Sequence, residues 1–374
     1  MSASASGSPS PRFGAVMFYD SVNRRVLLFG GASGGSEGYD YYNDMWSYDY
    51  AADSWVGVRT TGTPSGRFEQ PTVYDPDTRR LITYGEGQGD TGLHMWVFSV
   101  VDDTWAQLAS ASLPSPPRAS TPLVYDERYD KIIMFSGMSM EATADRFPED
   151  TWVYDSGLNR WELMSPDASP EGHYGHSFVY DPVNERTLMM GGHRWTSGNQ
   201  RDDSVSRGLW SYDYGSDSWT LIDDTQVPTM RHYHASAVNT DTGEFVVFGG
   251  GIFGENMHDD TWIWGDGGWV QVTSEPHPSA RALATMTYDP VNKVILLFGG
   301  MDEQTNYLGD LWALDSEGHW TQLRGVGEAE PIGDTTEPVE QTGSSGIPSY
   351  PAEAVTLALL ISTRIFGRRR WAES

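Results

Sequence analysis

Six basic residues recur at one position of a repeated motif, and their chemistry is anion binding. They are Arg12, Arg67, Arg118, His173, Arg231 and Arg281. Guanidinium groups hold carboxylates and phosphates by forked hydrogen bonds, so one interpretation is a cationic ring for an acidic ligand. The alternative pairs each base with a neighbouring acid, such as Asp44, Asp150, Asp260 or Asp310. We favour this alternative, because a base in every repeat is typical of a structural framework.

The histidines cluster in the fourth and fifth repeats and raise the question of a metal site. They are His173, His176, His193, His232, His234 and His258. A zinc site needs three or four imidazole or carboxylate groups that converge within about 2.0 to 2.2 Å of one ion. Two of these histidines, His176 and His234, stand three residues after the repeat base, which is typical of a framework position. We therefore predict no metal and no cofactor.

Aromatic residues in the variable loops are candidate ligand contacts. They are Tyr39, Tyr41, Tyr42, Phe147, Trp195, Phe253 and Tyr307. Exposed aromatic rings stack on sugars or anchor a protein partner. Trp195 is the preferred single contact, because it lies outside a regular set of paired tryptophans, and His193, Tyr41 and Phe253 complete the candidate binding set. The alternative is that these rings fold back on their own loops.

The spacing of the tryptophans indicates the repeated elements that position these residues. Twelve of the 15 tryptophans fall in six pairs, at 46/55, 96/105, 152/161, 210/219, 262/269 and 312/320. Each pair follows an apolar run that ends in glycine, such as LLFGG from Leu27 to Gly31. A glycine in a strand is unfavourable, so we expect positive φ or close backbone approach there. The pattern predicts six copies of one unit.

Each unit contains four short apolar or alternating runs, which predict four antiparallel strands. In the sixth unit they are 282–289, 293–300, 310–315 and 319–323. Six such sheets bury both faces when they pack radially, with tryptophans between them, so the fold class is all-β, a six-bladed β-propeller. Pro71 and Pro122 fall within first strands, which predicts that the first strand is the inner edge. We expect the first blade to keep its own first strand, so that closure is edge to edge.

The expected boundaries follow from the repeats. Residues 1–11 form an N-terminal link, 12–323 the propeller, 324–350 a disordered linker rich in Gly, Pro, Glu, Thr and Ser, and 351–374 an apolar segment with an arginine cluster. The blades are expected at about 12–60, 61–110, 111–165, 166–223, 224–273 and 274–323.

The tail resembles a prokaryotic C-terminal sorting signal, with a spacer, an apolar stretch and Arg368 to Arg370. The stretch 352–366 gives about 22 Å of helix, short of the roughly 30 Å of hydrocarbon in a bilayer. The alternatives are a degenerate surface anchor, an interfacial helix, or a tail without a membrane role. We expect membrane association through 352–370.

Composition narrows the partners. With 52 acidic and 24 basic residues the net charge is −28, which excludes nucleic acid as an expected partner and suits a salt-rich, halophilic setting. The absence of cysteine excludes disulfides, thiolate metal sites and a cysteine nucleophile. The first residues, MSASASGSPSPR, lack the basic and apolar regions of a secretion signal.

The motif as a whole resembles the kelch repeat, with a propeller like the central domain of galactose oxidase. It comprises Arg or His at the start of the first strand, Tyr-Asp at its end, Gly-Gly, Asp-x-Trp and Trp-x-x-Leu, and it covers about five sixths of the chain. Departures occur at Glu86, His94, Ser136, His173 and Leu209. The resemblance implies a propeller of six or seven blades that is most often a binding module. Kelch adaptors of ubiquitin ligases use arginines at this motif position to bind acidic peptides. The resemblance therefore keeps the interpretation of the bases as a cationic ring open.

We therefore expect a non-catalytic, monomeric recognition module. It would bind a protein or glycan through the face formed by the links between repeats and the loops between second and third strands. Display on the surface of a prokaryotic, halophile-like cell is expected, with a cytoplasmic location as the alternative. Galactose oxidase chemistry needs a cysteine-tyrosine crosslink, which this chain cannot form. The alternative function is a carbohydrate-active enzyme of epimerase or lyase type, which requires a histidine and a carboxylate in one mouth pocket.

Overall fold

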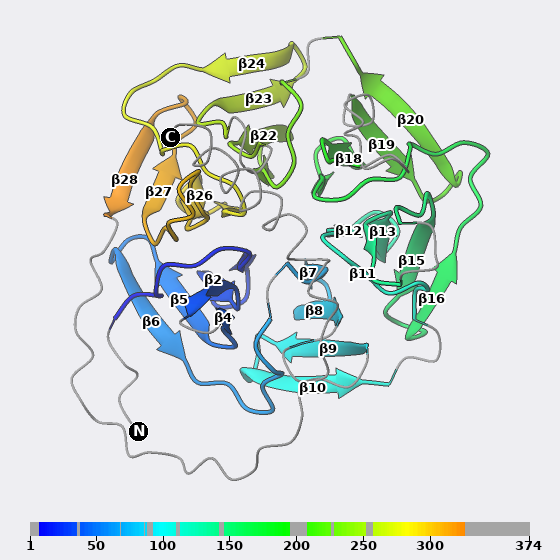
Figure 1. Cartoon of the computed structure of the whole chain (residues 1–374), viewed down its shortest axis with the longest axis horizontal. Helices are drawn as coiled ribbons and strands as arrows, with labels where there is room; N and C mark the ends of the chain where they lie inside the picture. The colour runs from blue at the N-terminus through cyan, green and yellow to red at the C-terminus, as the bar shows by residue number, and fades with distance from the viewer. Residues whose placement is uncertain are drawn as a thin grey trace, which may run out of the picture.

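Six four-stranded antiparallel sheets are arranged around a central axis (Figure 1), which confirms the six-bladed β-propeller. This computed structural model describes residues 7–35, 38–67, 69–85, 87, 93–109, 113–141, 146–194, 208–225, 228–251 and 257–325. The apolar tail, 351–374, and with it the expected membrane segment 352–370, lies outside the described residues, as does nearly all of the linker. Within the described ranges there is no helix with the length and apolarity that crossing a bilayer requires.

Each blade contains four consecutive long strands. In blades one to three they are β1 (Val16–Asp20), β2 (Arg25–Phe29), β5 (Met45–Asp49) and β6 (Ser54–Val58); β7 (Thr72–Asp75), β8 (Arg80–Gly85), β9 (His94–Ser99) and β10 (Thr104–Leu108); and β12 (Leu123–Asp126), β13 (Lys131–Phe135), β15 (Thr151–Asp155) and β16 (Arg160–Leu163). In blades four to six they are β17 (Ser177–Asp181), β18 (Arg186–Met190), β19 (Leu209–Asp213) and β20 (Ser218–Asp223); β21 (Ala235–Asn239), β22 (Glu244–Phe248), β23 (Thr261–Gly265) and β24 (Gly268–Val272); and β25 (Thr285–Asp289), β26 (Val294–Phe298), β27 (Leu311–Leu314) and β28 (Trp320–Arg324). Two short pairs extend the loops, β3 (Ala32–Gly35) with β4 (Gly38–Tyr41), and β11 (Arg118–Ala119) with β14 (Met138–Ser139).

The first strand of each blade lies nearest the axis, as predicted. β1 contacts β25, β25 contacts β21, and β17 contacts both β21 and β12. Pro71 and Pro122 each precede the first strand by one residue rather than lying within it, so neither removes a hydrogen bond from the ladder. β1 pairs with β2 in the sheet of its own blade, which confirms that closure is edge to edge.

Six apolar cores lie between the blades, and the second tryptophan of each pair is buried in one of them. Trp105 of blade two packs on Phe29 of blade one, with ring centroids 4.6 Å apart. At the point of closure, Trp55 of blade one packs on Phe298 of blade six at 5.6 Å. Each core therefore joins residues from two neighbouring sheets, which confirms the predicted role of the tryptophans.

The Gly-Gly steps combine positive φ with a close approach between blades. Gly299 and Gly300 have φ of 68° and 101°. A Cβ on Gly299 would lie 2.6 Å from the carbonyl oxygen of Arg12, and the N–H of Gly300 donates to that same oxygen at 2.9 Å. A side chain at Gly299 would push the first and last blades apart, so both expected causes act here.

Candidate functional site

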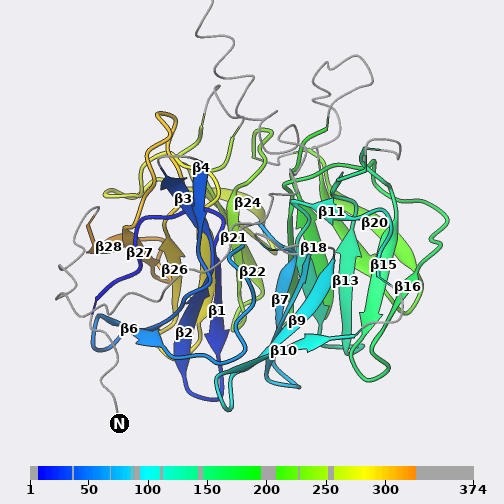
Figure 2. The same ribbon diagram turned by 60° about the horizontal axis from the view of Figure 1, so that its bottom comes forward.

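One face of the disc gathers the links between blades and the loops between second and third strands. Figure 2 shows the β3–β4 hairpin and β11 at this face, which we call the loop face. Each first strand runs away from the loop face, so the repeat bases lie just before it, at the head of the strand. The positions that follow each base lead toward the axis.

In four blades the repeat base is engaged in a buried framework contact. Arg281 donates from Nη1 and Nη2 to both oxygens of Asp310, at 2.6 and 2.8 Å, and Nη1 also donates to the carbonyl of Gly299. Asp310 in turn accepts from Trp312 Nε1 at 2.7 Å. The same arrangement joins Arg12 to Asp44, Arg118 to Asp150 and Arg231 to Asp260. These guanidinium groups point into the blades rather than toward a ligand.

The bases of blades two and four are also buried but have different surroundings. Arg67 donates from Nε to the carbonyl of Ser65 at 3.1 Å. His173 lies 2.6 Å by Nδ1 from the carbonyl oxygen of Glu171, and its backbone N–H donates to the hydroxyl of Ser136. Burial lowers the pKa of His173 to about 4, so this imidazole is neutral near pH 7.

The residue two positions after each base adopts a left-handed backbone conformation and forms a ring around the axis. Its members are Gly14, Glu69, Ser120, Gly175, Tyr233 and Leu283, with φ between 48° and 67°. Backbone hydrogen bonds connect neighbouring blades through this ring, for example from Leu283 N–H to the Tyr233 carbonyl at 2.9 Å. Left-handed φ is unfavourable for residues other than glycine, so the inter-blade bonds must hold Glu69, Ser120, Tyr233 and Leu283 in place.

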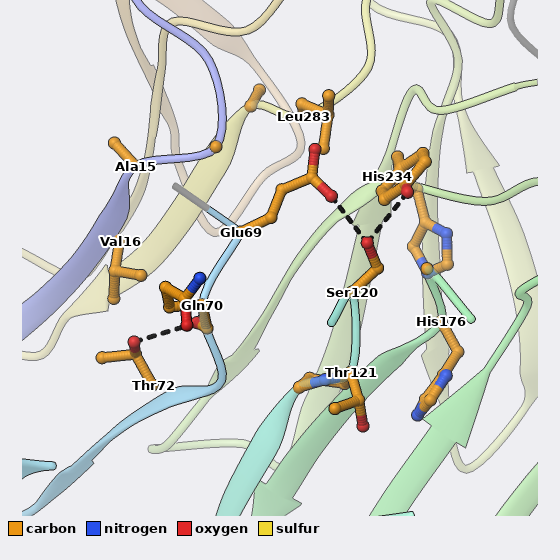
Figure 3. Close-up of a pocket in the computed structure, with 15 residues that line it drawn as sticks. Ala15, Val16, Glu69, Gln70, Thr72, Ser120, Thr121, His176, His234 and Leu283 are labelled. Carbon is orange, nitrogen blue, oxygen red and sulfur yellow. Dashed lines mark hydrogen bonds between the residues drawn. The ribbon is translucent and has the colours of Figure 1, made fainter. Parts of the chain in front are cut away.

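A pocket of about 200 Å³ opens at this ring, on the axis of the propeller. Figure 3 shows the side chains of Glu69, Ser120, Thr121, His176 and His234 around it. Sequence reasoning placed His176 in the framework and did not select Glu69, Ser120 or Tyr233. The signal that could have found Glu69 is its position, two residues after a repeat base, where it stands in place of a glycine such as Gly14.

Glu69 ends a hydrogen-bond chain in this pocket, and Ser120 is its middle member. Ser120 Oγ donates to Glu69 Oε2 at 2.7 Å (Figure 3). The same Oγ lies 3.0 Å from Tyr233 Oη. Either hydroxyl of the Ser120–Tyr233 pair can be the donor. Burial raises the pKa of Glu69 to about 7, and the hydrogen bonds from Ser120 and Tyr233 offset part of that rise.

The histidines near the pocket are neutral at physiological pH. Burial lowers the pKa of His234 to about 3 and that of His176 well below its usual value. His234 Nε2 lies 2.8 Å from Ser177 Oγ. His193 is buried against Tyr174 and His232, with ring centroids 5.9 and 5.3 Å away. In the described part of the chain, no group of three histidine, aspartate or glutamate residues is arranged to hold a metal ion.

The loop aromatics that are described pack on neighbouring side chains. Tyr307 stacks on Phe13 at 5.5 Å, and Tyr39 contacts both Phe13 and Tyr41. Tyr39, Tyr41 and Tyr307 stay partly exposed, whereas Phe147 is buried against Tyr174. Tyr42 lies 4.1 Å beneath the guanidinium of Arg12. The candidate contacts Trp195 and Phe253 lie outside the described residues.

The replacement Glu69→Gln tests the electrostatics of the pocket. A raised pKa means that the folded state holds the proton more tightly, so ionisation of Glu69 lowers stability as pH rises from about 4.5 to about 7. We expect the stability difference between Glu69→Gln and the unmodified protein to grow by about 1–3 kcal/mol in favour of the variant over that interval. Urea unfolding at a series of pH values measures it. A difference that stays constant with pH would contradict the raised pKa.

These features define a class: a β-propeller with a pocket on its axis and an Arg-Asp-Trp framework repeated in four of its blades. The family described as the KLHDC2/KLHL20/DRC7 Kelch-repeats domain matches residues 2–192 and 88–265, so the chain belongs to the kelch-repeat family. Kelch-repeat propellers are commonly used for protein interaction.

Two relatives illustrate how the repeat is used elsewhere. An F-box/kelch-repeat protein of Arabidopsis thaliana is 27% identical over 326 residues, which is 83% of this chain and 56% of the plant protein. Multiple epidermal growth factor-like domains protein 8 of Homo sapiens is 24% identical over 264 residues, 67% of this chain and 8% of the human protein. The chain thus spans about half or less of the length of these curated relatives.

Proposed function

We propose that this propeller is a recognition module that binds a protein partner at the loop face, around the axial pocket. The observation that carries the proposal is the pocket itself, which combines a carboxylate, hydroxyl groups and the ring of Tyr233. Tyr39 and Tyr41 lie close enough to Glu69 for its charge to raise the pKa of both hydroxyls, and both rings are partly exposed. Aromatic rings beside a few fixed polar groups are typical of interaction sites. The kelch-repeat family supports the choice of a protein as partner.

A glycan ligand and display at the surface of a prokaryotic, halophilic cell are finer parts of the same proposal. Tyrosine rings near the axis suit stacking on a sugar as well as contact with a protein. Surface display is supported by the resemblance of the tail to a sorting signal and by the net charge of −28. Fractionation of cells tests the membrane association of 352–370, and recovery of all protein in the soluble fraction would oppose it.

Replacement of loop-face aromatics tests the module. We expect the double change Tyr41→Ala and Tyr307→Ala to reduce binding on peptide and glycan arrays at least tenfold, since the truncation of a central aromatic contact typically costs about 2 kcal/mol or more. The matched control is Leu158→Ala, a 67% exposed residue in the turn between β15 and β16 on the opposite face. Equal losses for both variants, or none for the tyrosine pair, would count against this face.

A second candidate, an enzyme of epimerase or lyase type, is favoured by one observation. Glu69 lines the same pocket as His176 and His234, and a pKa near 7 suits a general base. However, His176 Nδ1 and Nε2 and His234 Nδ1 are buried from solvent, and His234 Nε2 faces Ser177. No imidazole nitrogen of this pair is thus placed to exchange a proton with a ligand, so binding is the better supported function.

A further inference from the structure

The charge at the axial pocket has one sign. Glu69 is the only Asp, Glu, Lys or Arg among the described residues that line it. The two lining imidazoles, His176 and His234, are neutral because burial lowers the pKa of each. The repeat arginines of blades one, three, five and six donate to aspartates within their own blades. An anionic ligand would therefore meet a carboxylate at the axis and find those four guanidinium groups already engaged.

The surroundings of Glu69 suit a cation instead. Tyr233 reaches the carboxyl through Ser120, and Glu69 is close enough to Tyr39 and Tyr41 to raise the pKa of both hydroxyls, in addition to the larger effect of burial. A carboxylate beside aromatic rings combines ion pairing with cation–π attraction. Ser120 and Tyr233 occupy two acceptor positions of a carboxylate that has about four, so the group can accept further donors.

We propose that the axial pocket binds a basic side chain of a protein partner, an arginine or lysine, with Glu69 as its counter-ion. This inference rests on the proposed function and adds the chemistry of the partner. The fixed carboxylate is costly to ionise without a counter-ion, and a guanidinium or ammonium group supplies one. The net charge of −28 also increases the rate at which a basic partner encounters the surface.

The proposed contact depends on pH, because the pKa of Glu69 is about 7. Above that pH the carboxylate is ionised and attracts the cation, and below it the neutral acid does not. The other titratable groups that face it stay neutral between pH 6 and 8, since burial raises the pKa of Tyr39, Tyr41 and Tyr233 and lowers that of His176 and His234. The ionised fraction of Glu69, and with it the affinity, should fall about tenfold from pH 8 to pH 6.

A pair of isosteric peptides tests the inference on the full chain. The probes are acetyl-Gly-Gly-Arg-Gly-Gly-amide and the same peptide with citrulline, which keeps the shape of arginine without its charge. Binding is followed by NMR through the methyl groups of Ala15, Leu283 and Ala284, which line the pocket. At pH 8 we expect at least tenfold weaker binding of the citrulline peptide, and at least tenfold weaker binding of arginine by Glu69→Gln.

A second variant keeps the carboxylate and tests the inference even if Glu69→Gln does not fold. Ser120→Ala removes a hydrogen bond that lowers the pKa of Glu69, so it should retain arginine binding with its pH midpoint moved upward. Equal affinity for the two peptides, or an unchanged affinity in Glu69→Gln, would overturn the inference. If acidic or neutral peptides bind the loop face while the arginine peptide does not, the inference fails and the recognition function stands. If peptides and glycans of every kind fail to bind, both fail.

Discussion

Replacement of Trp161 by alanine should lower the free energy of unfolding by about 3–5 kcal/mol. Trp161 of blade three is buried against Tyr84 of blade two and Tyr154 of its own blade, with ring centroids 6.0 and 5.2 Å away. Its Nε1 also donates to Met95 Sδ at 3.2 Å. The change leaves a cavity between two sheets that are held by the propeller on both sides, so collapse cannot fill it. Urea unfolding followed by circular dichroism measures the loss.

Two controls show whether the loss of stability comes from the indole ring that packs between the blades. Trp161→Phe keeps much of the ring and should cost about 1–2 kcal/mol. Leu158→Ala, three residues away on an exposed turn, should change stability by less than about 0.5 kcal/mol. A loss below 1 kcal/mol for Trp161→Ala would show that packing between blades does not depend on this indole.

The replacement Asp310→Ala should also cost about 3–5 kcal/mol, because it leaves the guanidinium of Arg281 buried without its counter-ion. The side chains of Arg281 and Asp310 are 1% and 3% exposed. The change also removes the acceptor of Trp312 Nε1. Thermal and urea unfolding report the loss.

Blade one supplies a matched comparison, in which the aspartate makes the same contacts but is more exposed to solvent. Asp44 pairs with Arg12 and accepts from Trp46 Nε1, but its side chain is 38% exposed. Water can reach the guanidinium once Asp44 is removed, so Asp44→Ala should cost about 1–2 kcal/mol. Equal losses in the two blades would show that burial of the pair does not set its contribution.

The periodic features of the fold were predictable because each recurs in four or more of the six blades. The second tryptophan of a pair, such as Trp161, packs between sheets in every blade. Gly299 meets the carbonyl oxygen of the next blade's repeat arginine, as Gly30, Gly191 and Gly249 do. The Pro71 prediction was right about the inner edge and wrong by one residue about the strand, since proline ends the link just before pairing begins.

The pocket could not be predicted, because its residues depart from the repeat. Glu69, Ser120 and Tyr233 occupy one position of the motif in three blades, and only the closure of the ring brings them within hydrogen-bond distance. The pairing of the repeat arginines with Asp44, Asp150, Asp260 and Asp310 was the interpretation favoured from the sequence, and the structure shows it in four blades. Residues that follow the repeat motif belong to the structural framework, whereas residues that depart from the motif line the pocket.

Titration of the Glu69 carboxyl by carbon-13 NMR, without and with the arginine peptide, is the most direct test of a carboxylate-centred recognition pocket. The account predicts a pKa of about 7 in the free protein, since burial opposes ionisation, and a lower pKa once arginine is bound. Glu69→Gln assigns the signal. A pKa near 4.5 that the peptide does not change would contradict the account.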